Sequence, residues 1–495
     1  MASIHGYERN PDREALRPYE HVHQYIDTHQ AAHVEEVRRF LRIPGFSATG
    51  EGMRESAQAC LEHLKGIGAE DVTLVDTGGF PVVTGVSRSK RPDAKWMLIY
   101  SLYDQVPVDP ADWTVDPLGA EIIDAGRLGL PRQIGPVICN RAAINQRGPM
   151  LATILGIRSM LEVDGDIPIN ILWCWEGEEE IGSPNLHVYV EKYKELIGRC
   201  QGMWVPGMRQ SMQGGMVVPH GYLGSCTFEL SCRGGDWGGT VDGRYIGPGH
   251  VVWVDAPLMR LIHAVASMFD RQDMPSVDGI ADLLTPLAPG EREQIEAVRA
   301  TYTSETETLW KAILGVNRFR EGRPMADFLD RLYTNVRGQV AGMYGGYTGP
   351  SWCGILPQQA VAKIGFGLPP GPSPEEVFRL VREHLDRRGF HEIKIEEPRG
   401  YASWRNKAGT HSVVQAGIRA ATMHGVPTME LPWSSWACPA EVLNRFGPDI
   451  PVSIVGLGHG ERLHQPDEYI CVDSIPLLAK YTVTYLHEWA RDHEA

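Results

Sequence analysis

The stretch Ile167–Ser183, "IPINILWCWEGEEEIGS", is a run of apolar residues that ends abruptly in acidic ones. A continuously apolar strand is covered on both faces, which is typical of a mostly parallel sheet between layers of helices. Polar side chains at the carboxyl end of such a strand lie at the edge of the sheet where α/β proteins bind ligands. The stretch therefore predicts an α/β fold and places Glu179 and Glu180 in a candidate site.

The segments around this stretch continue the α/β pattern and then change it. Before it, strand-like segments occupy residues 69–78, 81–87 and 95–104, and helical periodicity occupies residues 30–43 and 148–165. After about Gly215 the pattern is that of a smaller sheet, which gives way to the first pattern near residue 396. We expect a catalytic α/β domain made of residues 1–215 and 396–495, with an α+β lid and dimerisation domain inserted at 216–395.

Composition and charge exclude several classes of function. The chain has 495 residues, 43% hydrophobic content and a formal net charge of −15, so we expect several domains and no nucleic-acid partner. No apolar segment has the length of a signal peptide or a membrane span. Nine cysteines without a Cys-X-X-Cys pair favour neither disulfides nor a zinc knuckle. We predict a cytoplasmic protein without a membrane partner.

Three motifs resemble those of peptidase family M20, which includes aminoacylases, carnosine dipeptidases and succinyl-diaminopimelate desuccinylase. They are "SLYDQVPVDPADWTVDPLGA" at 101–120, "NRAAINQRGPMLATILGIRSML" at 140–161 and "EGEEEIGSPNL" at 176–186. Two more segments, residues 344–370 and 458–470, extend the resemblance through the insert to the C-terminus. The resemblance implies the two-domain architecture and dimerisation through the lid.

The family's chemistry uses two zinc ions, a bridging Asp and a Glu that takes the proton of a water. The resemblance places the base on Glu179, and two ligands on Glu180 and His464. It places the remaining ligands on the following residues, in chain order: Leu102 in place of His, Asp104 retained, Asn145 in place of the bridging Asp, and Pro206 in place of Asp. We therefore expect a degenerate site with no metal cofactor. One zinc on Asp104, Glu180 and His464 is the alternative.

The residues that would contact substrate have changed as well. The resemblance puts Gly238 where the family has an oxyanion-binding His, and puts Gly367 and Trp433 where it has arginines that bind a carboxylate. Losing such guanidinium groups removes the geometry suited to a carboxylate. The substrate-binding set that we expect is Leu102, Arg147, Trp204, Trp433 and Trp436. This pocket should be dry and aromatic and should prefer a neutral or cationic small metabolite.

Three functions remain open at this point. We favour an enzyme that uses Glu179, Glu180, Asp104, Asn145 and His464 for metal-independent acid–base catalysis, such as elimination, cyclisation or cleavage of an activated C–N bond. Zinc lowers the pKa of bound water from about 15.7 to about 7 to 9, so hydrolysis of a plain amide without zinc is disfavoured. The alternatives are a single-metal amidohydrolase and a noncatalytic homologue.

Overall fold

The computed structural model describes residues 9–407, 411–445 and 449–492. Its main sheet has the strand order β1-β2-β6-β3-β7-β17. The strands are Glu70–Val75 (β1), Val82–Ser87 (β2), Trp96–Leu102 (β3), Asn170–Glu176 (β6), Gly202–Trp204 (β7) and Val452–Ser453 (β17). From β6 to β17 all neighbours are parallel, whereas β2 runs antiparallel to both β1 and β6. The prediction of a mainly parallel α/β sheet is confirmed.

Helices cover this sheet and complete its core. They are Glu20–Thr28 (α2), Gln30–Leu41 (α3), Met53–Gly66 (α4), Gly148–Asp164 (α5), Leu186–Ile197 (α6), Ser412–Met423 (α12), Ala440–Asn444 (α13) and Ser474–Arg491 (α14). The apolar residues of β6 are buried between two clusters, one formed with α5 and α14 and one formed with α6 and α13. Burial on both faces explains why β6 is apolar along its length.

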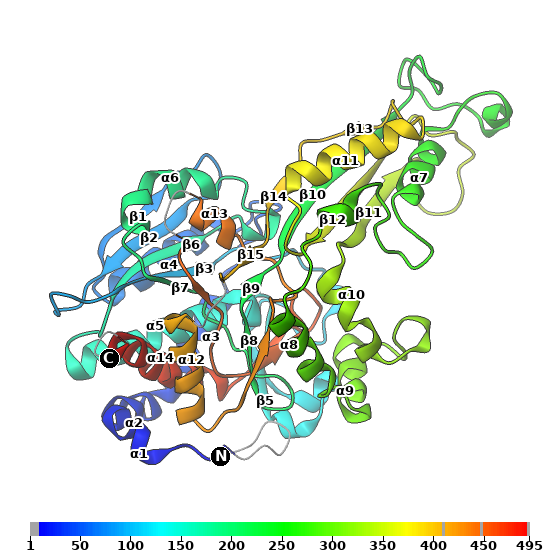
Figure 1. Ribbon diagram of the computed structural model, residues 1–495. Coiled ribbons are helices and arrows are strands. Elements are labelled where there is room, and N and C mark those ends of the chain that lie inside the picture. The colour runs from blue at the N-terminus through cyan, green and yellow to red at the C-terminus, as the bar shows by residue number, and fades with distance from the viewer. Residues whose placement is uncertain (1–8, 408–410, 446–448, 493–495) are drawn as a thin grey trace.

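A second sheet rises away from the first, together with helices α7 and α11 (Figure 1). Its strand order is β11-β12-β10-β13, with β14 pairing β10. The elements are Gly224–Arg233 (β10), Pro257–Ser267 (α7), Arg337–Gly345 (β11), Gln359–Leu368 (β12), Pro374–Arg387 (α11), Lys394–Ile395 (β13) and Arg399–Tyr401 (β14). A separate apolar core joins β10, β12, α7 and α11. This part of the structure is the lid, and its predicted boundaries at 216 and 395 stay a prediction.

Three helices within the insert pack away from the lid sheet. They are Pro289–Arg299 (α8), Ser304–Leu314 (α9) and Leu329–Thr334 (α10). Ile295 and Val298 of α8 lie in one apolar cluster with Leu431 and Trp433, and Ile313 of α9 lies in another with residues of the 113–139 region. These helices therefore contact the α/β part of the molecule.

The chain enters and leaves the lid through paired strands. Gly221–Tyr222 (β9) pairs antiparallel with Trp404–Arg405 (β15), and β14 then pairs with the first residues of β10. Two further short strands, Met216–Pro219 (β8) and Thr428–Leu431 (β16), form a parallel pair beside this connection. The connection brings Tyr222 and Tyr401 to the cavity between the two sheets.

Other expectations concern the cysteines and the membrane. All nine cysteines are free, and every one except Cys353 is buried, as expected of small apolar side chains. Within the described ranges, none of the helices combines the length and apolarity needed to cross a bilayer. Residues 1–8, which belong to the segment searched for a signal peptide, lie outside the described residues.

Candidate active site

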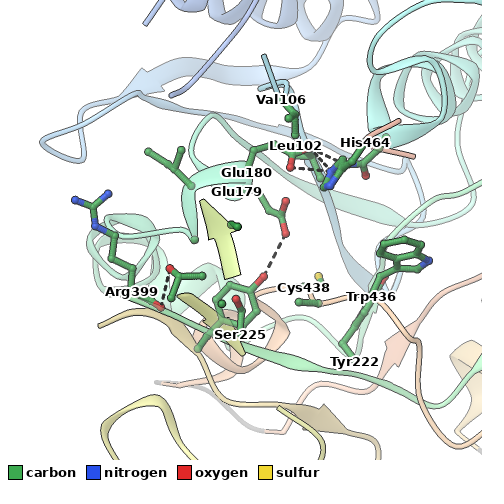
Figure 2. A pocket seen from close by; sticks show the side chains of 18 of the residues that line it. Leu102, Val106, Glu179, Glu180, Tyr222, Ser225, Arg399, Trp436, Cys438 and His464 are labelled. Carbon is green, nitrogen blue, oxygen red and sulfur yellow. Dashed lines mark hydrogen bonds and ion pairs between the residues drawn. The ribbon is translucent and has the colours of Figure 1, made fainter. Parts of the chain in front are cut away.

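A cavity of about 640 Å³ lies between the main sheet and the lid. Its floor contains Leu102, Asn145, Glu179, Glu180 and His464. Its other walls come from β10, β11, β12 and β14 of the lid and from the loop 434–438. In Figure 2, Glu180 and His464 lie side by side, and Glu179 points away from them. A cavity of this size suits a small molecule of dipeptide dimensions.

The ends of β3 and β6 place the floor residues. Leu102 is the parallel partner of Glu176, and the Tyr103 N–H continues the ladder by donating to the Glu176 carbonyl at 2.8 Å. Gly177 is needed at the next position because a Cβ there would lie 2.3 Å from the Tyr103 hydroxyl. The chain then turns, and Glu179 and Glu180 extend into the cavity. Strand pairing therefore brings two distant motifs to one place.

Glu179 is a carboxyl group that reaches into the cavity. The Tyr401 hydroxyl donates to its Oε1 at 3.2 Å. Burial, followed by the charges of Glu180, Asp104 and Glu176, raises the pKa of Glu179 well above its usual range. Below it, the Tyr100 hydroxyl donates to Glu176 at 2.6 Å, and burial raises the pKa of Glu176 to about 8. Carboxyl and tyrosine side chains thus make the bottom of the cavity acidic.

Glu180, His464 and Asn145 form a second cluster. His464 Nε2 lies 2.9 Å from Glu180 Oε2, and Asn145 Nδ2 donates to Glu180 Oε1 at 2.7 Å. Burial alone lowers the pKa of His464, but the Glu180 carboxylate more than offsets it, so the pKa is raised. Asn145 Nδ2 also lies 3.0 Å from His464 Nε2. The structure therefore brings together the three residues that the sequence predicted to support Glu179.

Asp104 lies behind this cluster and is fully buried. Its Oδ2 accepts the Glu180 N–H at 3.0 Å, so it helps to fix the Glu180 backbone. Its Oδ1 has no hydrogen-bond partner among the described residues. Burial and the neighbouring Glu180 charge raise the pKa of Asp104 to about 7.

Glu468 holds the loop that carries Asn145. Its Oε1 accepts the N–H groups of Ile144 and Asn145 at 2.9 and 3.0 Å, and its Oε2 accepts the Ala142 N–H at 3.1 Å. Arg141 Nη1 donates to the same Oε2 at 2.7 Å, in an ion pair that is almost fully buried. Glu468 is therefore a positioning residue that the sequence analysis did not identify.

Three predicted substrate-binding residues do not line the cavity. Arg147 is buried, and its guanidinium donates to the Tyr103 carbonyl and the Ser56 hydroxyl, so it is a structural residue. Trp204 is buried against Tyr485 of α14, and Trp433 is buried against Tyr333. Their side chains face the apolar core because neighbouring helices cover them. These three assignments were wrong.

Leu102 and Trp436 do line the cavity, as predicted. Cys438 lines it too, but burial raises the pKa of its thiol well above the usual value, which disfavours a thiolate nucleophile. Sequence reasoning missed Arg209, Tyr222 and Tyr401. The two positions of the family's arginines are Gly367 and Trp433 as stated, but Arg209 supplies a guanidinium group to the wall from another position. No local pattern marks these residues, since they converge only through the fold.

Comparisons with known proteins agree with this architecture. The model of peptidase family M20/M25/M40 matches residues 99–488. The Cys-Gly metallodipeptidase dug1 of Schizosaccharomyces pombe is 23% identical over 504 residues, covering 95% of this chain and 98% of its own. The Beta-Ala-His dipeptidase of Mus musculus is 22% identical over 438 residues, covering 82% of each chain.

Similarity to solved structures extends over nearly the whole chain. The crystal structure of an M20 family metallo-carboxypeptidase from Sulfolobus solfataricus has a TM-score of 0.79 and 26% identity, and covers 92% of this chain and 99% of that chain. The expectation that no metal cofactor is used is contradicted by these comparisons, because the S. solfataricus protein is named a metallo-carboxypeptidase and the S. pombe relative a metallodipeptidase.

The side chains of this chain nevertheless do not fit a centre of two metal ions. Leu102 and Pro206 offer no side-chain donor atom, and the Pro206 carbonyl accepts from Gln146 Nε2 at 2.8 Å. Asn145 directs an N–H donor, rather than a carboxylate, at Glu180. In residues 9–407, 411–445 and 449–492 no three His, Cys, Asp or Glu side chains are grouped so that they could hold a metal ion. Asp104, Glu180 and His464, the three ligands of the single-zinc alternative, therefore do not form such a group either.

Proposed function

The chain belongs to peptidase family M20/M25/M40, and from that premise we propose that it is an enzyme that acts on the amide bond of a dipeptide-sized molecule, with Glu179 as the proton-transfer residue. The observation that carries the proposal is the position of Glu179, whose carboxyl lines the cavity and accepts a hydrogen bond from Tyr401. A positioned carboxyl within reach of substrate suffices for general acid–base catalysis.

The surrounding residues have distinct roles in this proposal. Tyr401 orients the Glu179 carboxyl, and the Glu180–His464 pair holds a charged group beside the reacting bond. Asn145 fixes that pair through its amide, and Glu468 fixes the Asn145 backbone. Strands of the lid form the other side of the cavity and enclose the substrate there.

The test is the turnover of a panel of dipeptides and N-acyl amino acids by wild-type and Glu179→Gln proteins. The substitution keeps the shape of the side chain and removes its ability to transfer a proton. We expect the rate to fall by at least about a hundredfold, the usual contribution of a general base. Glu191→Gln, an exposed change on α6, is the matched control and should leave the rate unchanged. Full turnover in a folded Glu179→Gln protein would dismiss the assignment.

A noncatalytic binding protein is the second candidate. It is favoured by the mutual satisfaction of Glu180, Asn145 and His464, which hydrogen-bond to one another instead of pointing at an open reaction site. Binding of panel members without turnover by wild-type protein would support this candidate over the enzyme.

We also propose that the protein is a homodimer joined through the lid. Strand β11 is at the edge of the lid sheet, and Val340, Met343 and Tyr344 on it are exposed. An exposed apolar edge strand is a surface on which a second copy can pair. Cytoplasmic localisation stays a prediction from the sequence.

A further inference from the structure

One wall of the cavity carries a guanidinium group with unused hydrogen-bonding capacity. Arg209 follows β7 and lines the cavity, and its Nε is enclosed without a partner in the described ranges. Tyr222, Ser434 and Trp436 line the cavity too. In Figure 2, Tyr222 and Trp436 lie on the side opposite Arg399. An enclosed donor that lacks a protein partner is costly unless a ligand or water satisfies it.

A second guanidinium group lies behind the same wall. Arg337 begins β11 and is the antiparallel partner of Gly367 in β12. A Cβ at position 367 would lie 3.2 Å from Arg337 Nη2 and 3.3 Å from its Nε, so the guanidinium crosses over the glycine. Its Nη2 donates to the Ser435 carbonyl at 2.6 Å, next to the cavity-lining Ser434 and Trp436. Gly367 thus makes room for a guanidinium group from the neighbouring strand.

Both groups are positive charges without a paired carboxylate. Burial raises the pKa of Tyr333, whereas the positive charges of Arg337 and Arg209 lower it. Both guanidinium groups therefore lie close enough to the Tyr333 hydroxyl to interact with it electrostatically. Glu461 interacts with Arg209 over a longer distance, and burial raises its pKa to about 7. In the described part of the chain no carboxylate lies within ion-pair distance of either guanidinium. A bound anion would provide the missing counter-charge.

We propose that Arg209, with Arg337 behind it, forms an anion-binding subsite that receives the carboxylate of the substrate. This inference rests on the proposed function for the presence of a substrate in the cavity. It replaces the expectation of a neutral or cationic ligand, because the guanidinium groups come from positions that the sequence resemblance does not mark. Arg209 contacts the anion, and Arg337 supports it through the Ser435 loop.

The experiment compares hippurate with its neutral counterpart hippuramide by isothermal titration calorimetry. The two ligands differ only in the carboxylate, so their affinity ratio reports the subsite in the wild-type protein. We expect hippurate to bind at least about tenfold more tightly, the typical effect of one hydrogen bond to a charged group. Arg209→Gln should weaken hippurate by about the same factor and leave hippuramide unchanged. Arg199→Gln, an exposed change, is the matched control.

Several outcomes would overturn the inference. They are equal or tighter binding of hippuramide, no hippurate binding at millimolar concentration, and an equal loss of both ligands in Arg209→Gln. The same titrations with Glu179→Gln separate this inference from the proposed function. A carboxylate preference in protein that turns over no panel member would keep the subsite and remove the enzyme assignment. Turnover of dipeptides and dipeptide amides at equal rates would keep the enzyme assignment and remove the carboxylate subsite.

Discussion

Replacing Glu468 by Gln tests how strongly this buried carboxylate stabilises the loop that carries Asn145. The carboxylate has no exposed surface and accepts from Arg141 and from the backbone of Ala142, Ile144 and Asn145. The amide keeps one acceptor oxygen but turns an N–H donor toward groups that also donate. At least one of these partners therefore loses its acceptor, and Arg141 loses its counter-charge.

The expected loss of stability follows from the burial of this ion pair. The side chains of Arg141 and Glu468 are 5% and 0% exposed, and removing one partner of a buried pair costs about 3–5 kcal/mol. Arg141 retains two contacts, a hydrogen bond to the Gln465 carbonyl at 3.2 Å and the ring of Trp113 at 5.1 Å. We therefore expect the lower end of that range, about 3 kcal/mol.

The assay is equilibrium urea denaturation followed by tryptophan fluorescence. Glu468→Gln, Arg141→Met and the double variant complete a double-mutant cycle, which isolates the interaction between the two side chains. Glu383→Gln is the matched control because its partners Arg379 and Arg387 are exposed on α11, and an exposed pair contributes about 0.5 kcal/mol or less. A loss below about 1 kcal/mol in Glu468→Gln, or additive single losses in the cycle, would refute the reasoning.

Two further predictions concern the lid and the N-terminal helix α2, which carries His23. Light scattering of the purified protein should give about twice the chain mass of 54.9 kDa, and Val340→Lys on β11 should give the monomer; a wild-type monomer would reject the dimer. Burial lowers the pKa of His23 to about 4, so the unfolded chain binds a proton between about pH 6.5 and 4 that the folded chain does not, and stability present above pH 6.5 falls by about 3 kcal/mol over that range. His23→Gln should reduce the dependence of the melting temperature on pH between pH 6.5 and 4.5. The remaining slope comes from His33, His424 and His487, whose pKa values burial also lowers. The exposed His21→Gln should leave the slope unchanged, and an unchanged slope in His23→Gln would contradict the prediction. The titratable groups facing His23 are Tyr19, His21, Asp27, His424 and Lys480.

Part of the site was predictable because it depends on strand order. The apolar run of β6 ends at Glu176, and the end of the parallel strand β3 lies at the same edge of the sheet, where Glu179 lines the cavity as the sequence indicates. His464 and Asn145 were placed through the family resemblance, which fixes positions over long separations in the chain. These predictions needed no knowledge of side-chain direction.

The errors concern side-chain direction and residues brought in by tertiary packing. Arg147 follows the Asn145 loop, and only the fold shows that it turns back toward the Tyr103 carbonyl. Trp204 and Trp433 belong to segments beside the site, but their rings pack into the core. Arg209 has no motif of its own. Its role depends on the neighbouring lid and on the absence of a carboxylate partner, and neither can be inferred from local composition.

The pairing of β9 with β15 makes the whole inserted domain equivalent to one long surface loop of the α/β core. Antiparallel partners lie about 4.5–5.5 Å apart at their Cα atoms, so a short turn from Tyr222 to Trp404 could replace everything between them without altering the order of the main sheet. The entropy of closing a loop grows only with the logarithm of its length. The order of the main sheet therefore does not depend on the size of the insert, although α8 and α9 of this insert also pack on the α/β part.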